Sequence, residues 1–423
     1  MRIAVIGSGI GGLASSWLLS RLHEVTLFEA NDYLGGHTHT HRVRLGGRDY
    51  AVDSGFIVFN PRHYPLFTAL LAELGVASRP TTMSFSVHNE ASGLEYNATS
   101  LNTLFCQRRN LLAPRFLGMI RDLLRFYREA PRLLTGDAPG PTLAEYLTEG
   151  RYGAAFRDDH LVPMASALWS SPPAQILSFP ARFLVQFMAN HQMLRARGRP
   201  EWRVVSGGSA SYVDALRARW PVRERLGCPV HSVRRDARAV SVAHAGGAER
   251  FDHVVLACHS DQALALLADA SAAERAVLGA IAYQANEAVL HTDTSMLPRR
   301  PEARAAWNAF VPRDPGAPCT VSYCMSLLQG LDSPEPLIVT LNRTAAIDPA
   351  KILRTMRYAH PVHTHDALGA QRRRREIQGV NRTWFAGAYW GWGFHEDGMR
   401  SATAVAAALD ARCAQPSRRQ AAA

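Results

Sequence analysis

The residues with the clearest chemical meaning are four glycines that follow a short apolar run near the start of the chain. The apolar run covers residues 3–6, and the glycines are Gly7, Gly9, Gly11 and Gly12. This pattern predicts a buried parallel strand that turns into a helix, whose N-terminus binds a pyrophosphate. Gly7 permits the tight turn, Gly9 lets the backbone approach the phosphates, and Gly12 lets the helix pack on the strand. We therefore expect a dinucleotide-binding site at this turn.

The segment that follows supplies the acidic residue that such a site needs. Apolar residues recur at helical spacing over residues 13–22, and residues 25–28 have the composition of a second strand. Glu29 comes directly after this strand, 22 residues beyond Gly7, close to the roughly 20 residues expected for a carboxylate that binds a ribose hydroxyl. Without this context, the glycines would indicate no more than a turn in an ordinary βαβ unit.

Length and composition indicate a globular chain with more than one domain. The chain has 423 residues, of which 47% are hydrophobic and 20% charged, and this length suits two or three domains. No apolar run approaches the roughly 18 residues typical of a membrane span, and residues 3–6 are too few for a signal-peptide core. We therefore expect a cytoplasmic location.

The chain is basic, with a formal net charge of +11, and Lys351 is the one lysine among its 47 basic residues. Positive charge favours contact with anionic lipid, whereas we expect no nucleic-acid partner. The arginine run at residues 372–375 is interpreted as a solvated face.

Neither the cysteines nor the histidines are spaced as metal ligands. The six cysteines (106, 228, 258, 319, 324 and 413) contain no CxxC pair, which indicates reduced thiols. His37, His39 and His41 alternate as on one face of a strand, and residues 360–365 contain three more histidines. No carboxylate or cysteine accompanies either group at a familiar spacing, so we expect no bound metal.

Several elements are predicted by turn signals and periodicity. We expect a hairpin that turns at Gly46 and Gly47, a helix over residues 66–75 that ends at a glycine, and a second hairpin around residues 83–97. Residues 161–194, rich in Phe, Leu, Met and Pro, predict helices that either surround an apolar cavity or fill a core.

Residues 108–134 form the most amphipathic stretch. The side chains expected to share one helical face are Phe116, Ile120, Leu123, Leu124 and Tyr127. One interpretation is that this face docks onto a membrane surface or an acyl substrate. The other is that a surface helix packs on the core.

The motifs together resemble those of the FAD-dependent amine oxidase and phytoene desaturase superfamily. The matching pieces are GSGIGG, Glu29 with LGGH, VDSGF, SGGS at residues 206–209, PVHSV, DHVVLA and FAGAYWGWGFHEDGMRSA. DSGFIVFN, ALWS, FMANH and GFHEDG resemble one branch in particular, the bacterial flavoproteins that accompany cyclopropane-fatty-acyl-synthase-type lipid methyltransferases. The resemblance covers essentially the whole chain.

The resemblance implies an α/β fold, α+β overall, with a glutathione-reductase-like FAD-binding Rossmann domain. A substrate domain of mixed sheet and helices would interrupt it. The FAD-binding domain would comprise residues 1–75, 200–275 and 370–414, and the substrate domain residues 76–199 and 276–369. Residues 415–423 would form a disordered tail.

The resemblance also assigns residues to FAD. Near the N-terminus these are the four glycines at the pyrophosphate, Glu29 with Ala30 at the ribose, and Gly35, Gly36 and His37 beside the phosphates. His37 stands where the superfamily commonly has a phosphate-binding arginine. Val230 would meet the adenine, Gly387 and Ala388 the ribityl chain and pyrophosphate, and Asp397, Gly398 and Met399 would begin a helix facing the flavin. The N–H groups of that helix would stabilise a reduced flavin anion.

Substrate and catalytic residues are expected beside the flavin. Tyr389, Trp390, Trp392 and Phe394 form either an aromatic cage for a cation or apolar walls for an acyl chain. His395 and Glu396 are the candidates for accepting a proton, and the alternative is that they cap a helix or hold the aromatic loop. His191 is a weaker candidate.

The substrate predicted from these features is a lipid. Residues 285–292 lack the lysine that many amine oxidases of the superfamily carry there, and the middle section is rich in Phe and Leu. The leading hypothesis is FAD-dependent oxidation, above all desaturation, of an unsaturated, methylated or cyclopropane fatty acyl chain. The alternatives are a redox-neutral double-bond isomerase of a fatty acid or carotenoid, a polyamine oxidase, and a non-catalytic partner of a lipid methyltransferase. A lipid methyltransferase partner and peripheral contact with the inner membrane face through residues 108–134 are also expected.

Overall fold

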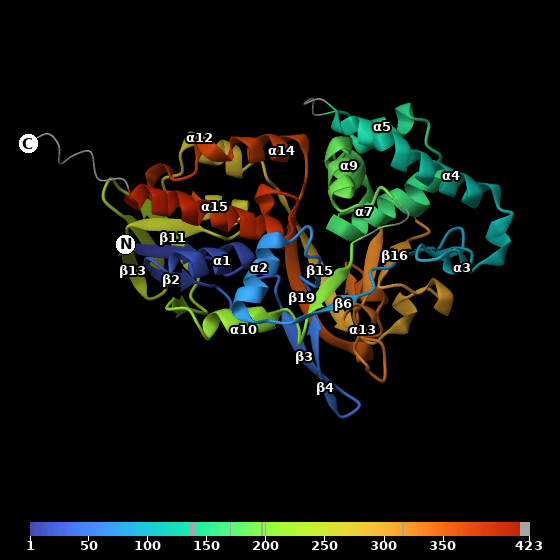
Figure 1. Cartoon of the computed structure of the whole chain (residues 1–423), viewed down its shortest axis with the longest axis horizontal. Helices are drawn as coiled ribbons and strands as arrows, with labels where there is room; N and C mark the ends of the chain where they lie inside the picture. Colours follow the sequence, from blue (N-terminus) through green and yellow to red (C-terminus); the bar gives the residue numbers. More distant parts are fainter. Residues whose placement is uncertain (136–139, 170, 196–197, 199, 315–316, 415–423) are drawn as a thin grey trace, which may run out of the picture.

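The computed structural model describes the chain apart from residues 136–139, 170, 196–197, 199, 315–316 and 415–423. The predicted disordered tail lies outside the described residues. The protein has two halves, which lie left and right in Figure 1. One is built on a parallel sheet and the other on a mixed sheet covered by helices, which confirms the predicted mixed α/β fold.

The first half is organised around a five-stranded parallel sheet with the order β10-β2-β1-β14-β20. Its strands are β1 (Arg2–Ile6), β2 (Glu24–Phe28), β10 (Arg223–Arg225), β14 (His253–Leu256) and β20 (Thr383–Phe385). β1 pairs with β2 in parallel, from Arg2 opposite Glu24 to Ile6 opposite Phe28. β1 is apolar because a central parallel strand is covered on both faces.

Alternate residues of β1 contact two different layers. Ile3 and Val5 pack against helices, whereas Ala4 and Ile6 pack against an antiparallel sheet. The first layer contains α1 (Ile10–Leu19), α2 (Pro65–Leu74), α10 (Ala210–Arg217) and α15 (His395–Ala414). The second contains β11 (Val230–Arg235), β12 (Val240–His244), β13 (Gly247–Phe251), α11 (Ser260–Leu266) and α12 (Ala272–Leu278). The predicted strand–turn–helix at the N-terminus is therefore confirmed.

The second half contains a seven-stranded sheet with the order β19-β15-β18-β17-β16-β7-β8. Its strands are β7 (Phe85–Asn89), β8 (Leu94–Asn97), β15 (Tyr283–His291), β16 (Trp307–Val311), β17 (Thr320–Cys324), β18 (Ile338–Leu341) and β19 (Ile352–Pro361). β3 (Thr40–Leu45) and β4 (Arg48–Asp53) form the predicted hairpin, which turns at Gly46 and Gly47. A smaller sheet combines β5 (Val58–Phe59), β6 (Ser78–Thr81) and β9 (Trp202–Val205).

Helices cover the mixed sheet in the upper right of Figure 1. They are α3 (Leu101–Leu104), α4 (Pro114–Glu129), α5 (Leu143–Glu149), α6 (Ala154–Phe156), α7 (Val162–Trp169), α8 (Pro173–Ser178) and α9 (Ala181–Asn190). Their apolar side chains form one cluster with Val87 and Ala309 of the sheet. The short α13 (Met325–Leu328) follows β17, and α14 (His365–Arg372) follows β19. No helix among the described residues is long and apolar enough to cross a membrane.

The amphipathic stretch differs from its prediction in one respect. A short turn at Arg108–Leu111 precedes α4, which begins at Pro114, as suits proline's fixed φ. α4 buries Phe116 and Phe126, whereas Leu124 is 55% exposed, so the side chains expected to share one face are not equally buried. Asp122 sets the rotation of the helix, because its buried carboxylate accepts the Gly153 N–H at 2.8 Å.

Candidate active site

The first glycine turn leaves room for an anion at the N-terminus of α1. Gly7 has φ +97°, and a Cβ at Gly12 would collide with the Gly7 carbonyl oxygen. A Cβ at Gly9 would meet nothing within 4 Å. α1 begins without a side-chain cap and without an acidic residue in its first turn, so its N-terminal dipole is available to a ligand. This geometry suits the close approach of a pyrophosphate to the backbone.

Glu29 is hydrogen-bonded to the segments that are expected to surround the adenosine. Its carboxylate accepts the Ser8 N–H at 2.9 Å and the Asn31 N–H at 2.9 Å. The Cys228 N–H donates to the Glu29 carbonyl oxygen at 2.9 Å, which places the start of the β11 segment, with half-buried Val230, beside the end of β2. Ala30 follows Glu29 and is exposed. The structure therefore brings Glu29 and the Val230 segment together at the carboxyl end of β2.

The second glycine pair lies against the first turn. Gly35 donates its N–H to the Ser8 carbonyl oxygen at 3.1 Å, and a Cβ at Gly36 would lie 3.1 Å from the Gly9 Cα. His37 follows, and its Nε2 is buried without a hydrogen-bond partner among the described residues. An unpaired buried ring nitrogen beside an open backbone cradle fits a phosphate oxygen. On this observation the residues present fit FAD.

A chain of amide groups fixes the tautomer of a histidine near His37. The Glu287 N–H donates to Asn342 Oδ1 at 2.8 Å, and Asn342 Nδ2 donates to Asn286 Oδ1 at 2.7 Å. Asn286 Nδ2 must then donate to His360 Nδ1, at 2.8 Å. Because the backbone N–H can only donate, every amide in the chain is oriented, and the His360 proton lies on Nε2.

His360 belongs to a group of neutral imidazoles. Its ring centroid lies 5.2 Å from that of His37, which lies 6.2 Å from that of His259. Burial lowers the pKa of His360 to about 4 and lowers the pKa values of His37 and His259 as well. Among the remaining histidines of the two sequence groups, His39 stacks on Tyr33 at 4.1 Å and lies 4.0 Å from His41, whereas His363 stacks on Phe183 at 4.5 Å. In the described part of the chain, no three His, Cys, Asp or Glu side chains are arranged to hold a metal ion.

The N-terminus of α15 converges on that of α1. Gly398 lies against Ile10, and a Cβ at Gly11 would lie 3.2 Å from the Gly387 nitrogen. α15 begins at His395 rather than at Asp397, because the Asp397 and Gly398 N–H groups already donate to the Phe394 carbonyl oxygen. Met399 is buried in the core that α15 shares with α1, and Ala388 opens the short turn after Gly387. The glycine turn at Gly7 and the turn at Gly387 are therefore 380 residues apart in the chain but adjacent in the structure.

His395 and Glu396 are engaged within the protein. His395 Nε2 lies 2.9 Å from Thr38 Oγ1, and its ring stacks on Phe56 with a centroid distance of 3.4 Å. Burial lowers the pKa of His395 to about 3. The Glu396 carboxylate accepts the Leu66 and Phe67 N–H groups at 3.0 and 3.1 Å, at the start of α2. Their role as proton acceptors stays a prediction, and these contacts favour the structural alternative.

The four aromatic residues expected to line a pocket divide between the two halves. Tyr389 and Trp390 pack with the core behind the parallel sheet. Trp392 and Phe394 pack with the helical layer, where Phe394 stacks on Phe187 at 5.2 Å. The two pairs pack against different cores because the chain turns between them at Gly391, which lies against Asp397. The four rings therefore do not form one cage.

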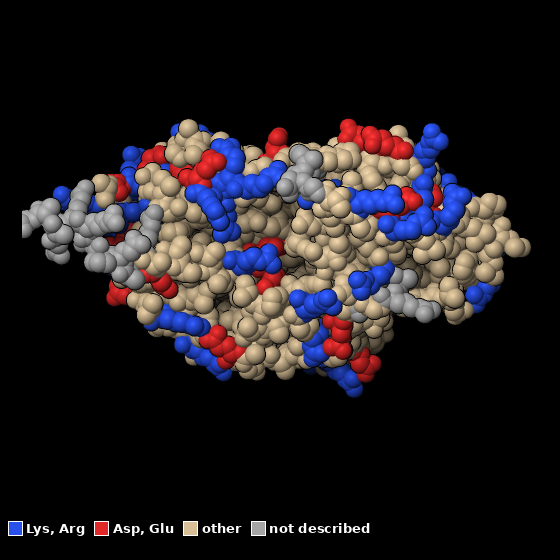
Figure 2. Space-filling model, turned by 45° about the horizontal axis from the view of Figure 1, so that its top comes forward, with Lys and Arg blue, Asp and Glu red and all other residues tan. Residues whose placement is uncertain are grey.

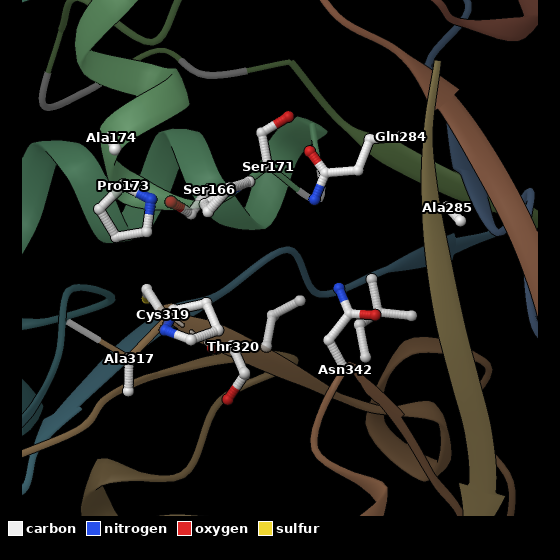
Figure 3. A pocket seen from close by; sticks show the side chains of 14 residues that line it. Ser166, Ser171, Pro173, Ala174, Gln284, Ala285, Ala317, Cys319, Thr320 and Asn342 are labelled. Carbon is white, nitrogen blue, oxygen red and sulfur yellow. Dashed lines mark hydrogen bonds between the residues drawn. The ribbon is translucent and has the colours of Figure 1, made fainter. Parts of the chain in front are cut away.

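A cavity of about 410 Å³ lies between the helical layer and the mixed sheet, as Figure 3 shows. On the helical side it is bordered by Ser166 of α7 and by Ser171, which lies between α7 and α8. On the sheet side it is bordered by Gln284 of β15, Thr320 of β17 and Asn342, which follows β18. The described residues that line it carry no charge and no aromatic ring. Asn342 is also the middle amide of the chain that ends at His360, so this wall is joined to the imidazole group.

Sequence reasoning missed Gln284, Asn286, Thr320 and Asn342. A weak signal existed at Asn342, where φ is +54°, because asparagine tolerates the left-handed conformation after a strand. The structure also places two further residues from the sequence analysis, His191 and Lys351. His191 Nδ1 donates to the Phe187 carbonyl oxygen at 2.9 Å inside the helical layer. Lys351 Nζ lies 3.9 Å from Asp293 Oδ1, beyond the end of β15.

One thiol lies directly behind the first glycine turn. A Cβ at Gly7 would lie 3.0 Å from the Cys258 nitrogen. Burial raises the pKa of the Cys258 thiol to about 12.

The parallel sheet, the two glycine turns and the converging helix N-termini define a dinucleotide-binding flavoprotein. Residues 10–335 match the family model of flavin-containing amine oxidoreductases. The chain belongs to this family, and it is an FAD-dependent oxidoreductase.

Curated relatives match only short stretches. A tryptophan 2-monooxygenase of Allorhizobium ampelinum is 34% identical over 107 residues, 24% of this chain and 14% of that protein. The flavin-dependent L-tryptophan oxidase RebO of Lentzea aerocolonigenes is 40% identical over 63 residues, 15% of this chain and 13% of that protein. The match therefore spans a small part of either relative.

Solved structures share the fold over nearly the whole chain. A putative protoporphyrinogen oxidase from Exiguobacterium sp. 255-15 has a TM-score of 0.69 at 17% identity, covering 97% of this chain and 99% of its own. A CLA-producing fatty acid isomerase from P. acnes has a TM-score of 0.68 at 16% identity, covering 96% and 98%. Cyclohexylamine oxidase from Brevibacterium oxydans has a TM-score of 0.68 at 16% identity, covering 98% and 99%. At these identities the likeness shows the fold alone.

Proposed function

We propose that this flavoprotein oxidises a lipid, and that its reaction is the desaturation of an unsaturated, methylated or cyclopropane fatty acyl chain. The observation that carries the proposal is the uncharged cavity between the helical layer and the mixed sheet. An acyl chain enters such a cavity without a desolvation cost for any charged side chain. A cationic amine would need a carboxylate or an aromatic face there.

The half of the protein that is built on the parallel sheet also supports this chemistry. FAD, when bound, supplies the acceptor for the hydride that leaves the acyl chain. The Gly9 backbone and His37 would hold its phosphates, and the N-terminus of α15 would favour negative charge on the reduced ring. The neutral imidazoles of His37, His259 and His360 add no charge to this region at neutral pH.

The test is anaerobic incubation of the FAD-loaded protein with membrane lipids from cells with and without the companion methyltransferase. We expect the flavin absorbance to bleach and the lipid to lose two hydrogens. An oxidised flavin with unchanged lipid would overturn the proposal. If the protein also copurified with the methyltransferase, that result would support a non-catalytic partner.

A second candidate is a redox-neutral double-bond isomerase. The fatty acid isomerase from P. acnes shares the fold, so this fold can carry such a reaction on a fatty acid. Anaerobic turnover that moves a double bond, with neither lasting bleaching nor loss of mass, would establish it. A polyamine oxidase would instead release peroxide with an amine panel.

Membrane contact through residues 108–134 belongs to the same proposal. Leu112 is 87% exposed and Leu124 55% exposed, and Arg121 lies on the outer face of the same segment. Apolar and basic side chains on one surface favour an anionic bilayer. A Leu112→Glu variant should bind phosphatidylglycerol vesicles several-fold more weakly in a sedimentation assay. Unchanged sedimentation would remove this surface from the proposal.

A further inference from the structure

Two polar atoms in the wall of the uncharged cavity are buried and have no hydrogen-bond partner among the residues that the structure describes. One is the hydroxyl oxygen of Ser166 on α7, and the other is Oε1 of Gln284 on β15. The Ser166 residue is 4% exposed, and Figure 3 shows the Gln284 carboxamide pointing from β15 into the cavity. Buried polar atoms without a partner are rare in native proteins, so this pair needs an explanation.

Other polar side chains in the same wall do have partners. Ser171 Oγ donates to the Trp169 carbonyl oxygen at 3.2 Å. Asn342 uses both ends of its side-chain amide, in hydrogen bonds of 2.8 and 2.7 Å. The fold is therefore able to pair polar groups at this wall, and Ser166 and Gln284 are exceptions to that pattern.

An unpaired buried atom makes a site selective. The folded chain loses stability because the atom has given up its bond to water and has gained no other. A ligand that supplies the missing hydrogen bond recovers this free energy on binding, whereas an analogue without the group does not. A site built in this way discriminates strongly between the two ligands.

The chemistry of the two atoms limits what the ligand can present. The described lining of the cavity carries no charge, so an ionised group would lose its water there without a counter-charge. Gln284 Oε1 is a carbonyl oxygen that can only accept, so the ligand must donate, whereas the Ser166 hydroxyl can donate or accept. An alcohol meets both requirements, because its hydroxyl donates one hydrogen bond and accepts others. An ether oxygen only accepts and would leave Gln284 Oε1 unpaired.

We infer that Ser166 and Gln284 bind a hydroxyl group on the part of the lipid that enters the cavity. The inference rests on the proposed lipid substrate and adds to it the chemical class, a chain that carries an alcohol. The alcohol donates to Gln284 Oε1, and the Ser166 hydroxyl donates to the alcohol oxygen. A plain hydrocarbon segment would leave both protein atoms unpaired.

Titration of the FAD-loaded full chain with two isomeric probes tests the inference. Octan-1-ol and 1-methoxyheptane contain the same atoms, but only the alcohol can donate a hydrogen bond. Calorimetry under anaerobic conditions measures binding, and the flavin spectrum reports any oxidation of the probe. We expect octan-1-ol to bind about tenfold or more tightly than 1-methoxyheptane. Equal dissociation constants for the two isomers would overturn the inference.

Variants assign the preference to the two atoms. S166A/Q284M removes the hydroxyl and the carboxamide with little change of shape, and it should abolish the preference for the alcohol. Gln175 on α8 provides the matched control, since its Oε1 is also buried without a partner among the described residues but does not line the cavity. Q175M should keep the preference. A preference that survives in S166A/Q284M, or that Q175M reduces equally, would overturn the inference.

Thermal unfolding gives a readout that does not depend on any ligand. Because the two atoms have no partner within the described fold, S166A and Q284M should each unfold at the wild-type temperature or above it. A lower unfolding temperature for both variants would show that the atoms are paired inside the protein and would contradict the inference. An alcohol preference without any lipid oxidation would refute the proposed reaction alone, and lipid oxidation without the preference would refute this inference alone.

Discussion

Two hollows border the helical layer, and they differ most in charge. The cavity beneath α7 and α8 is lined by serine, threonine, amide and apolar side chains. A groove between α9 and α14 has three arginines and one aspartate in its lining, beside apolar side chains. Figure 2 shows the surface hollowed between the two halves, with basic side chains gathered around the hollow. The cavity and the groove have similar size, at about 410 and 580 Å³, so charge rather than room distinguishes them.

The difference indicates which of the two hollows suits an acyl chain. A charged group in the cavity would have to lose its water without a partner, which costs several kcal/mol. An acyl chain in the groove would instead take water from guanidinium groups and offer them no hydrogen bond. In the proposed reaction, the uncharged cavity therefore accepts the reacting part of the chain.

A charge placed in the cavity should have the largest effect. Thr320 is buried and lines the cavity, so Thr320→Asp would force a carboxylate beside the acyl chain. We expect a loss of about 100-fold or more in kcat/KM for lipid, measured as the rate of flavin bleaching. Thr320→Val, which keeps the shape, should stay within about fivefold. A fully active Thr320→Asp enzyme would show that the reacting chain lies elsewhere.

A buried histidine beside the groove should control acid stability. His363 stacks on Phe183 at 4.5 Å, and burial lowers its pKa to about 3. Below a pKa of about 6.5 the unfolded chain takes up a proton that the folded chain refuses, so stability falls as the pH falls from there toward the folded pKa. From about pH 7 to about pH 5 this group should cost about 2 kcal/mol in the free energy of unfolding.

Denaturant unfolding across this pH range measures that effect. His363→Phe should lose this part of the acid sensitivity. His365→Asn, in the groove wall two residues away, serves as the control and should retain it. Equal pH slopes for His363→Phe and the wild type would contradict the assignment.

The smallest expected effect is that of salt, which should weaken the binding of a charged substrate and leave that of an uncharged substrate unchanged. The net charge of +11 attracts an anionic substrate, and raising NaCl from about 0.05 to about 0.5 M shortens the range of this attraction several-fold. The KM for a free fatty acid should rise by about three- to tenfold, whereas the KM for its uncharged methyl ester should stay unchanged. A parallel rise for both substrates would argue against electrostatic attraction of the substrate.

The sequence predicted features that depend on local backbone geometry. Gly7 and Gly12 are required by a turn and a close contact within the first residues, and the hairpin at Gly46 and Gly47 follows from two adjacent positive φ angles. Helix α2 ends at Gly75, whose φ of +69° forms the expected cap. Such features are encoded within a few residues, so motif and periodicity are sufficient to find them.

Contacts between distant segments could not be predicted in this way. Glu396 accepts hydrogen bonds from residues about 330 positions earlier in the chain. Asn286 and Asn342 meet through the pairing of β15 with β18, which depends on sheet register. Only Arg372 of its run reaches the groove, because helix rotation and the pairing of Arg373 decide where each side chain points.

The thiol of Cys258 bears on the durability of the enzyme. Thiolates, not thiols, react with peroxide and alkylating agents. With a pKa of about 12, the cysteine behind the first glycine turn stays protonated at neutral pH. An oxidase that leaks peroxide at its flavin would therefore be spared self-inactivation at this position.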